Sequence, residues 1–112
     1  APLMVRLCMG IPWRAPDDLN TFMAMVNKVP PDWIYSAFSI GRHQMPYVAA
    51  AVLSGANVRV GLEDNLWLGK GRLATNAELV EHAVTIIEAM GVRIMTPEEV
   101  RAELQLTKRA LP

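Results

Sequence analysis

Three ionisable side chains that could carry out chemistry together lie in the middle of this sequence: Arg59, Glu63 and Asp64. The run 57–63, Asn-Val-Arg-Val-Gly-Leu-Glu, alternates between apolar residues and polar or glycine residues, which is typical of a half-buried strand. Side chains two residues apart share a face of a strand, so Arg59 and Glu63 are expected to point away from the apolar face. Asp64 follows at the end of the strand.

An arginine inside an apolar strand requires an acidic partner or an anionic ligand, because a buried charge without one is unstable. Such an arginine can bind a carboxylate, and the neighbouring acids can transfer protons or bind a metal. The structural alternative is that Glu63 and Asp64 form an exposed turn or a helix cap. Arg59 favours the chemical interpretation.

The elements that position these residues alternate between strands and helices. Residues 3–9 alternate as a strand, and the amphipathic pattern from about Pro16 to Lys28 predicts a helix with Asp17 and Asp18 at its positive end. Residues 33–39 form a second expected strand, and residues 43–53 a second helix. Residues 57–63 are then the third strand.

After the third strand, a polar loop is expected over residues 64–74. Thr75 and Glu78 form a capping box for a helix that ends at Gly91, and Thr96 begins a last helix through about Leu104. This order predicts parallel βαβ units in a single α/β segment, 1–112, without an internal boundary. We expect part of a (β/α)8 TIM barrel, namely its C-terminal three βα units and a final short helix. A small open sheet is the alternative.

The amino-acid composition argues against several classes of binding partner. Eleven basic and eleven acidic residues give zero net charge, which argues against a nucleic acid or an anionic membrane surface as partner. No apolar run is long enough to span a membrane. The lone Cys8 fits a reducing, cytoplasmic setting and a small buried side chain. The N-terminus has no signal-peptide pattern and leads directly into a strand, so the chain is expected to begin within a domain.

The motif around Arg59 resembles the C-terminal signature of the beta-keto acid cleavage enzymes. The resemblance lies in residues 57–66, Asn-Val-Arg-Val-Gly-Leu-Glu-Asp-Asn-Leu, followed by Gly-Lys-Gly at 69–71 and Thr-Asn-Ala-Glu-Leu-Val at 75–80. The segment 40–44, Ile-Gly-Arg-His-Gln, is also similar to that family. Together these segments extend the match over most of residues 33–104.

This resemblance implies a zinc-dependent acyltransferase in which a beta-keto acid reacts with acetyl-CoA to give acetoacetate and a new acyl-CoA. The best-known activity of the family acts on 3-keto-5-aminohexanoate in lysine fermentation. Glu63 matches the carboxylate zinc ligand of the family, and Arg59 and Asp64 match its catalytic arginine and acid. A homo-oligomer is expected.

The resemblance also implies a pair of histidine zinc ligands one residue apart, and this sequence has only His43 and His82. His82 is expected to be solvated, and His43 either to approach a ligand or to cap or lie exposed at a helix start. The chain alone is therefore expected to be inactive, with the N-terminal half of the barrel supplied by other residues. A non-catalytic half-barrel module for binding or oligomerisation is the alternative.

A second ligand site is expected after the second strand. In barrels of this type the loops after the last two strands often bind phosphate, so Gly41 and Arg42 are predicted to contact a phosphate of coenzyme A. The alternative is a turn glycine followed by a solvated arginine.

Overall fold

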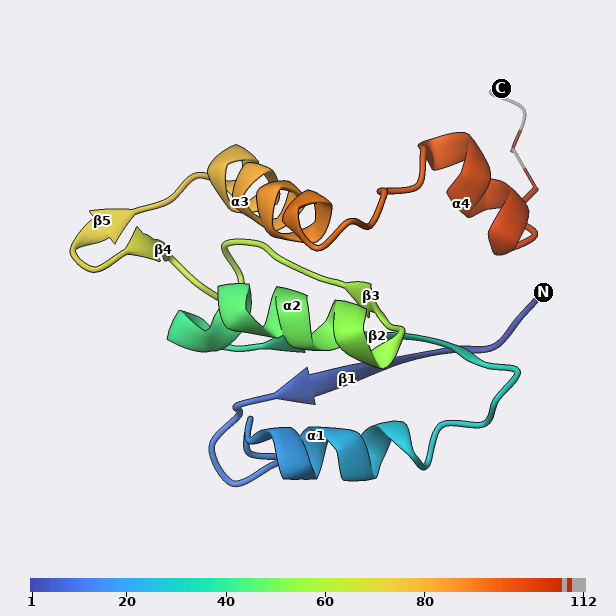
Figure 1. The fold of residues 1–112 in the computed structure, drawn as a ribbon, viewed down its shortest axis with the longest axis horizontal. Coiled ribbons are helices and arrows are strands. Elements are labelled where there is room, and N and C mark those ends of the chain that lie inside the picture. The colour runs from blue at the N-terminus through green and yellow to red at the C-terminus, as the bar shows by residue number, and fades with distance from the viewer. Residues whose placement is uncertain (108, 110–112) are drawn as a thin grey trace.

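The computed structural model describes residues 1–107 and 109. Its elements follow one another along the chain as shown in Figure 1: β1 (Met4–Met9), α1 (Leu19–Val26), β2 (Ile34–Ser39), the short 3-10 helix η1 (Gly41–His43), α2 (Gln44–Ser54), β3 (Asn57–Val58), β4 (Trp67–Gly69), β5 (Arg72–Leu73), α3 (Asn76–Ala89) and α4 (Pro97–Glu103). No helix among these described residues is long and apolar enough to cross a membrane.

Strands β1, β2 and β3 form a parallel sheet in the order of the sequence. Both α1 and α2 pack on the same face of it, because Phe22 of α1 and Tyr47 of α2 belong to one cluster with Leu7 and Ala37 of the strands. The rings of Phe22 and Tyr47 lie 5.3 Å apart. The α/β prediction is confirmed, and this one-sided, sequential arrangement is compatible with part of a barrel.

The third helix continues this layer. Ala83 and Ile87 of α3 contact Val48 of α2, and Val58 and Val60 pack against the same cluster. The helices α1, α2 and α3 therefore follow one another across the sheet (Figure 1). The side chains at the centre of this layer, such as Phe22, Val48 and Ala83, are removed from water by their neighbours, which is the main source of stability for such a fold.

Local signals explain where the helices begin and end. The Asp18 carboxylate accepts a hydrogen bond from the Thr21 N–H and caps α1. Thr75 and Glu78 form the predicted capping box of α3, with both of its hydrogen bonds present. Gly55, at a φ of +92°, ends α2 in the left-handed conformation that glycine adopts without strain.

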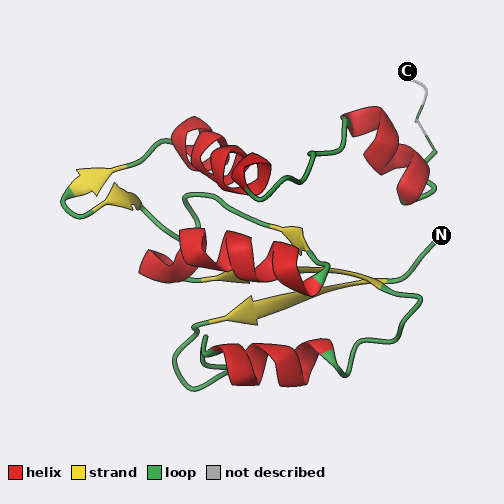
Figure 2. Cartoon of the chain, viewed as in Figure 1, coloured by secondary structure: helices red, strands yellow, loops and turns green. Residues whose placement is uncertain are grey.

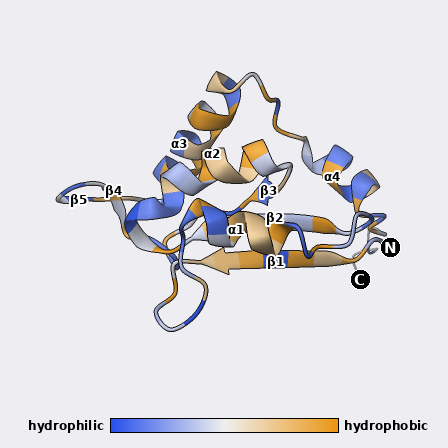
Figure 3. Cartoon of the chain, turned by 60° about the horizontal axis from the view of Figure 1, so that its bottom comes forward, coloured by the Kyte–Doolittle hydropathy of each residue, from blue (hydrophilic) through white to orange (hydrophobic). Residues whose placement is uncertain are grey.

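The face of the sheet opposite the helices carries a row of polar residues. Arg6, Ser36 and Asn57 are aligned across the three strands, on the face opposite the helices. Arg6 is the charged residue of β1, whose ribbon is otherwise largely apolar in Figure 3. Val100 and Leu104, at the C-terminal part of the described chain, line a cleft of about 300 Å³ together with these polar residues.

The region after β3 differs from the prediction in two ways. The third strand ends at Val58 and does not continue to Glu63, because the Gly61 carbonyl accepts hydrogen bonds from Asp64 and Asn65 within a turn. The segment expected to be a loop over residues 64–74 contains the antiparallel hairpin β4–β5, which extends away from the parallel sheet (Figure 2). Gly71, at a φ of +74°, provides the tight turn of this hairpin.

We predict that Phe22→Ala lowers the free energy of unfolding by about 3–5 kcal/mol, because it leaves a cavity where α1 meets the sheet. Phe22 is 1% exposed, whereas Met23 on the same helix is 42% exposed. Met23→Ala is the matched control, with an expected change within about 0.5 kcal/mol. Urea denaturation of the protein measures both, and equal effects of the two substitutions would contradict this account of the core.

Candidate active site at the end of the third strand

The centre of the site is an ion pair between Arg59 and Asp64. The Arg59 Nε lies 2.9 Å from Asp64 Oδ2, and its Nη2 lies 3.4 Å from Oδ1. The Asp64 side chain is only 5% exposed, so this fork of two donors stabilises a carboxylate that has little contact with water. The guanidinium carbon also lies 4.7 Å from the centre of the Phe38 ring, which adds a cation–π contact.

Glu63 is on the opposite, solvent side of Arg59. Its Oε2 accepts a hydrogen bond of 2.6 Å from Arg59 Nη2, and its side chain is 84% exposed. Sequence alternation predicts Arg59 and Glu63 together inside and Asp64 at the strand end. The structure brings all three together, but through a turn, and Asp64 is the buried acid. Glu63 therefore has a carboxylate that a ligand can approach.

The turn that carries the two acids is tied to other elements. The Gly41 N–H donates to the Asp64 carbonyl at 2.7 Å, and the Leu62 N–H donates to the Asn76 side chain at the start of α3, at 2.9 Å. The buried Gln44 side chain donates to the Gly61 carbonyl at 3.0 Å. These bonds connect η1, the start of α2 and the start of α3 to the turn, so the geometry of the site is fixed by four segments of the chain.

Cys8 lies on the same face of the sheet as this site, since it is paired in register with Phe38. Burial and the negative charge of Asp64 raise the pKa of the Cys8 thiol, and the positive charge of Arg59 only partly opposes this effect. The thiol is therefore kept in its neutral form and is a poor nucleophile. The sequence predicts a small buried side chain, whereas Cys8 is only half-buried in the structure.

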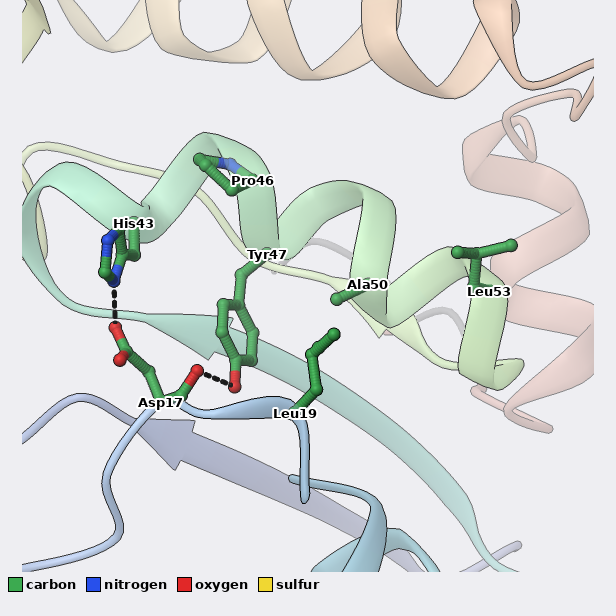
Figure 4. Close-up of a pocket in the computed structure, with 7 residues that line it drawn as sticks. All are labelled: Asp17, Leu19, His43, Pro46, Tyr47, Ala50 and Leu53. Atoms are coloured by element: carbon green, nitrogen blue, oxygen red, sulfur yellow. Dashed lines mark hydrogen bonds and ion pairs between the residues drawn. The ribbon is translucent and has the colours of Figure 1, made fainter. Parts of the chain in front are cut away.

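A second polar cluster, which the sequence did not predict, is formed by Asp17, Ser39, His43 and Tyr47. Figure 4 shows Asp17 between His43 and Tyr47. Asp17 Oδ2 accepts from the Ser39 hydroxyl at 2.9 Å and lies 2.5 Å from His43 Nδ1. Tyr47 donates to the Asp17 backbone carbonyl at 2.8 Å. The sequence relates Asp17 only to the helix dipole, because its partners are 22 to 30 residues away.

The environment of this cluster changes two pKa values. Hydrogen bonds from His43 and Ser39 hold the pKa of Asp17 below its ordinary value, although burial acts in the opposite direction. Burial, with the charges of Asp17 and Asp18, raises the pKa of Tyr47 to about 12, so its hydroxyl remains a donor. His43 is therefore oriented by Asp17 at the N-terminus of α2, and its side chain makes no capping hydrogen bond there.

Comparison with known proteins assigns the chain to a family. The family model described as beta-keto acid cleavage enzyme matches residues 1–106. The chain belongs to the beta-keto acid cleavage enzyme family. The resemblance inferred from the motif around Arg59 is thereby confirmed.

Several curated relatives of this beta-keto acid cleavage enzyme chain have named reactions. A 3-dehydrocarnitine:acetyl-CoA trimethylamine transferase of Rhizobium meliloti is 70% identical over 108 residues, which are 96% of this chain and 36% of the relative. A 3-keto-5-aminohexanoate cleavage enzyme of Fusobacterium nucleatum is 41% identical over 85 residues, covering 75% of this chain and 31% of the relative. A 3,5-dioxohexanoate:acetyl-CoA acetone transferase of Paraburkholderia graminis is 42% identical over 76 residues, covering 67% and 24%. The chain thus spans about a third of the length of these relatives, or less.

The described part of this beta-keto acid cleavage enzyme chain does not by itself fit a catalytic zinc site. Such sites usually have three protein ligands, and no group of three or more histidine, cysteine or acidic side chains that could hold a metal occurs among the described residues. Glu63 is the exposed carboxylate at the site, Asp64 is buried against Arg59, and His43 is bound to Asp17. Within the described residues, the site therefore offers a metal one accessible carboxylate.

Two of the remaining predicted residues, Arg42 and His82, line a cleft next to the site. Arg42 is exposed and lines a cleft of about 630 Å³, to which His82, exposed as expected, also contributes. Gly41 has a φ of +72°, and its N–H is already bonded to Asp64. Gly41 therefore shapes the turn, and Arg42 supplies the positive charge.

The lowered pKa of Asp17 predicts how the stability of the protein changes at acid pH. Because its folded pKa lies below the ordinary value of 3.8, its interactions stabilise the folded state above that pH, and this contribution disappears as the pH falls through the folded pKa. Asp17→Asn should lower stability at pH 7 and flatten the decline in stability below about pH 4. Thermal unfolding between pH 3 and 7 measures this. Asp32→Asn, at an exposed position, is the control; an unchanged acid profile in Asp17→Asn would refute the assignment.

Proposed function

We propose that the whole protein containing this chain is an acyltransferase that exchanges groups between a beta-keto acid and acetyl-CoA. In this reaction the bond between C2 and C3 of the keto acid breaks, and C2 with its carboxylate joins the acetyl group to give acetoacetate. The remaining acyl group leaves on coenzyme A as a new thioester. The observation that carries this proposal is Arg59 held between the buried Asp64 and the exposed Glu63, in a member of this family.

Arg59 is proposed to bind the substrate carboxylate. Its Nε and Nη2 are used by the two acids, whereas Nη1 donates to no acceptor in the described part of the chain. A carboxylate bound there would place the carbon that becomes the nucleophile beside Asp64, which we propose as the group that takes and returns protons. The Phe38 ring and Asp64 fix the guanidinium before the substrate arrives, which is the preorganisation that favours catalysis.

We propose 3-dehydrocarnitine as the keto acid. The support is the 70% identity, over nearly the whole chain, to a relative named for that substrate, compared with 41% or less to the relatives named for 3-keto-5-aminohexanoate. 3-Dehydrocarnitine has both features that the reaction requires, a carboxylate and a keto group at C3.

The fold of the whole protein is proposed to be a closed (β/α)8 barrel. The helices cover one face of the sheet, and the polar row of Arg6, Ser36 and Asn57 is on the other face, where a barrel has its interior. In such barrels the catalytic groups lie at the carboxyl ends of the strands, as Arg59 and Asp64 do here. We further propose a cytoplasmic homo-oligomer.

Zinc is proposed for the whole protein with Glu63 as one ligand, and its other ligands coming from residues outside this chain. When bound, zinc would act as a Lewis acid on the keto oxygen. The support from this chain is limited to the exposed carboxylate of Glu63, which is next to the arginine that we assign to the substrate.

The first test of the function is Arg59→Lys. We predict that kcat/KM for 3-dehydrocarnitine falls about 10²- to 10³-fold, because lysine cannot hold two acids and a substrate carboxylate together. Arg93→Lys is the control, since Arg93 forms an exposed pair with Glu99 elsewhere on the surface. Acetoacetate formation from acetyl-CoA measures the rate. The proposal is wrong if Arg59→Lys keeps full activity.

The second test concerns the metal. Glu63→Gln in the whole protein is predicted to lower bound zinc and to reduce activity, while circular dichroism remains that of the wild type because the side chain is exposed. Glu81→Gln, on the exposed surface of α3, is the control. Elemental analysis of the purified variants measures zinc. Unchanged zinc content in Glu63→Gln would exclude Glu63 as a ligand.

A further inference from the structure

The cleft that Arg42 and His82 line is bounded by three separate segments. Its wall consists of the start of α2, the β4–β5 hairpin and α3, and its volume of about 630 Å³ is in the range of small-molecule sites. In Figures 1 and 2 the hairpin projects beyond the N-terminal ends of α2 and α3. We propose that this cleft binds the nucleotide end of acetyl-CoA; the inference rests on the proposed function.

The charges of the cleft fit a phosphorylated ligand. Arg42 and Lys70 line it, and no acidic side chain does so within the described part of the chain. Within residues 1–107 and 109, neither of these two cations forms an ion pair, whereas the nearby Arg72 is paired with Glu78. Two cations with no protein counter-charge favour an anionic ligand, and phosphate groups are bound in this way by arginine and lysine.

The apolar part of the cleft fits the adenine base of coenzyme A. Trp67 remains 49% exposed in β4, and Met45 and Leu68 lie in the same wall. An indole ring that is half exposed beside two cations provides a stacking surface for a purine. The combination of an aromatic face with two cations is the chemistry of an adenine nucleotide, and it is not that of a small keto acid.

The cleft is joined directly to the candidate active site. Asn65, which is buried, fixes the backbone of Trp67 through two hydrogen bonds: its Nδ2 donates to the Trp67 carbonyl at 2.7 Å, and its Oδ1 accepts from the Trp67 N–H at 3.1 Å. Asn65 directly follows Asp64, and Arg42 directly follows Gly41, whose N–H is bonded to the Asp64 carbonyl. A cosubstrate bound in the cleft is therefore close to the site at which C2 of the keto acid would take over its acetyl group.

The hairpin leaves space for a ligand. A Cβ atom added to Gly69 or Gly71 would meet no atom within 4 Å, so these glycines do not serve close packing. They place Lys70 at the turn between them, with Gly71 in the left-handed conformation. The side chain of Lys70 can thus reach a phosphate without competing neighbours at the tip.

The test compares acetyl-CoA with S-acetylpantetheine, which has the same thioester but no nucleotide. Lys70→Ala and Arg42→Ala in the whole protein are expected to raise KM for acetyl-CoA about tenfold each, the usual effect of losing one charged contact of about 1.4 kcal/mol. KM for S-acetylpantetheine and for the keto acid should not change. Lys28→Ala, at the exposed C-terminal end of the α1 region, is the matched control and should leave all three values unchanged.

The aromatic contact is tested separately. Trp67→Ala is expected to weaken acetyl-CoA binding, and Trp67→Phe to restore most of the loss because a phenyl ring can still stack. A purely structural role of Trp67 in the hairpin would change KM for both thioesters alike. Such a parallel change, or no change with any of the variants, would overturn the assignment of the cleft.

A direct measurement separates this inference from the proposed function. Calorimetric titration of the whole protein with coenzyme A should show binding that Lys70→Ala and Arg42→Ala weaken about tenfold. If the wild type binds coenzyme A in this way but forms no acetoacetate, the proposed reaction is wrong and the assignment of the cleft to coenzyme A is confirmed. If it forms acetoacetate while these variants bind coenzyme A normally, the assignment of the cleft is wrong and the proposed reaction is retained.

Discussion

The local structure depends on the ion pair between Arg59 and Asp64. A carboxylate that is 5% exposed is stable as an ion only if a partner compensates its lost hydration, and Arg59 is that partner. The pair also explains why the strand stops early. The chain turns at Gly61 so that Asp64 can return to the guanidinium, and the turn is held by bonds from Gly41, Gln44 and Asn76. The helix η1 and the starts of α2 and α3 are thus all connected to the turn that carries Asp64.

Where local signals decide the structure, the sequence predicted it well. The Thr75–Glu78 capping box and the glycine stop at Gly91 act within one helical turn, and both are present as expected. The predicted third strand was wrong beyond Val58 because alternation alone does not distinguish a strand from a turn that returns to Arg59. The hairpin was missed because its strands have only three and two residues.

The two polar clusters of the site also differ in how far their contacts can be predicted from the sequence. Arg59, Glu63 and Asp64 lie within six consecutive residues, so their meeting could be predicted, although which acid is buried could not. Asp17 and His43 are 26 residues apart, and only the parallel arrangement of β1 and β2 brings the loops after these strands together. A contact of this kind depends on tertiary structure, since no short motif encodes it.

The two faces of the parallel sheet have different roles: one packs against the helices, and the other carries polar residues. Leu7, Ala37 and Val58 are directed to the helices and hold the layers together, whereas Arg6, Ser36 and Asn57 form the polar row on the opposite face. Changes on the polar face can therefore alter the ligand without loss of the core. Several relatives are named for acetyl-CoA but for different keto acids. We expect a segment that they share with this chain to serve the common cosubstrate, which is the part of the reaction that does not vary.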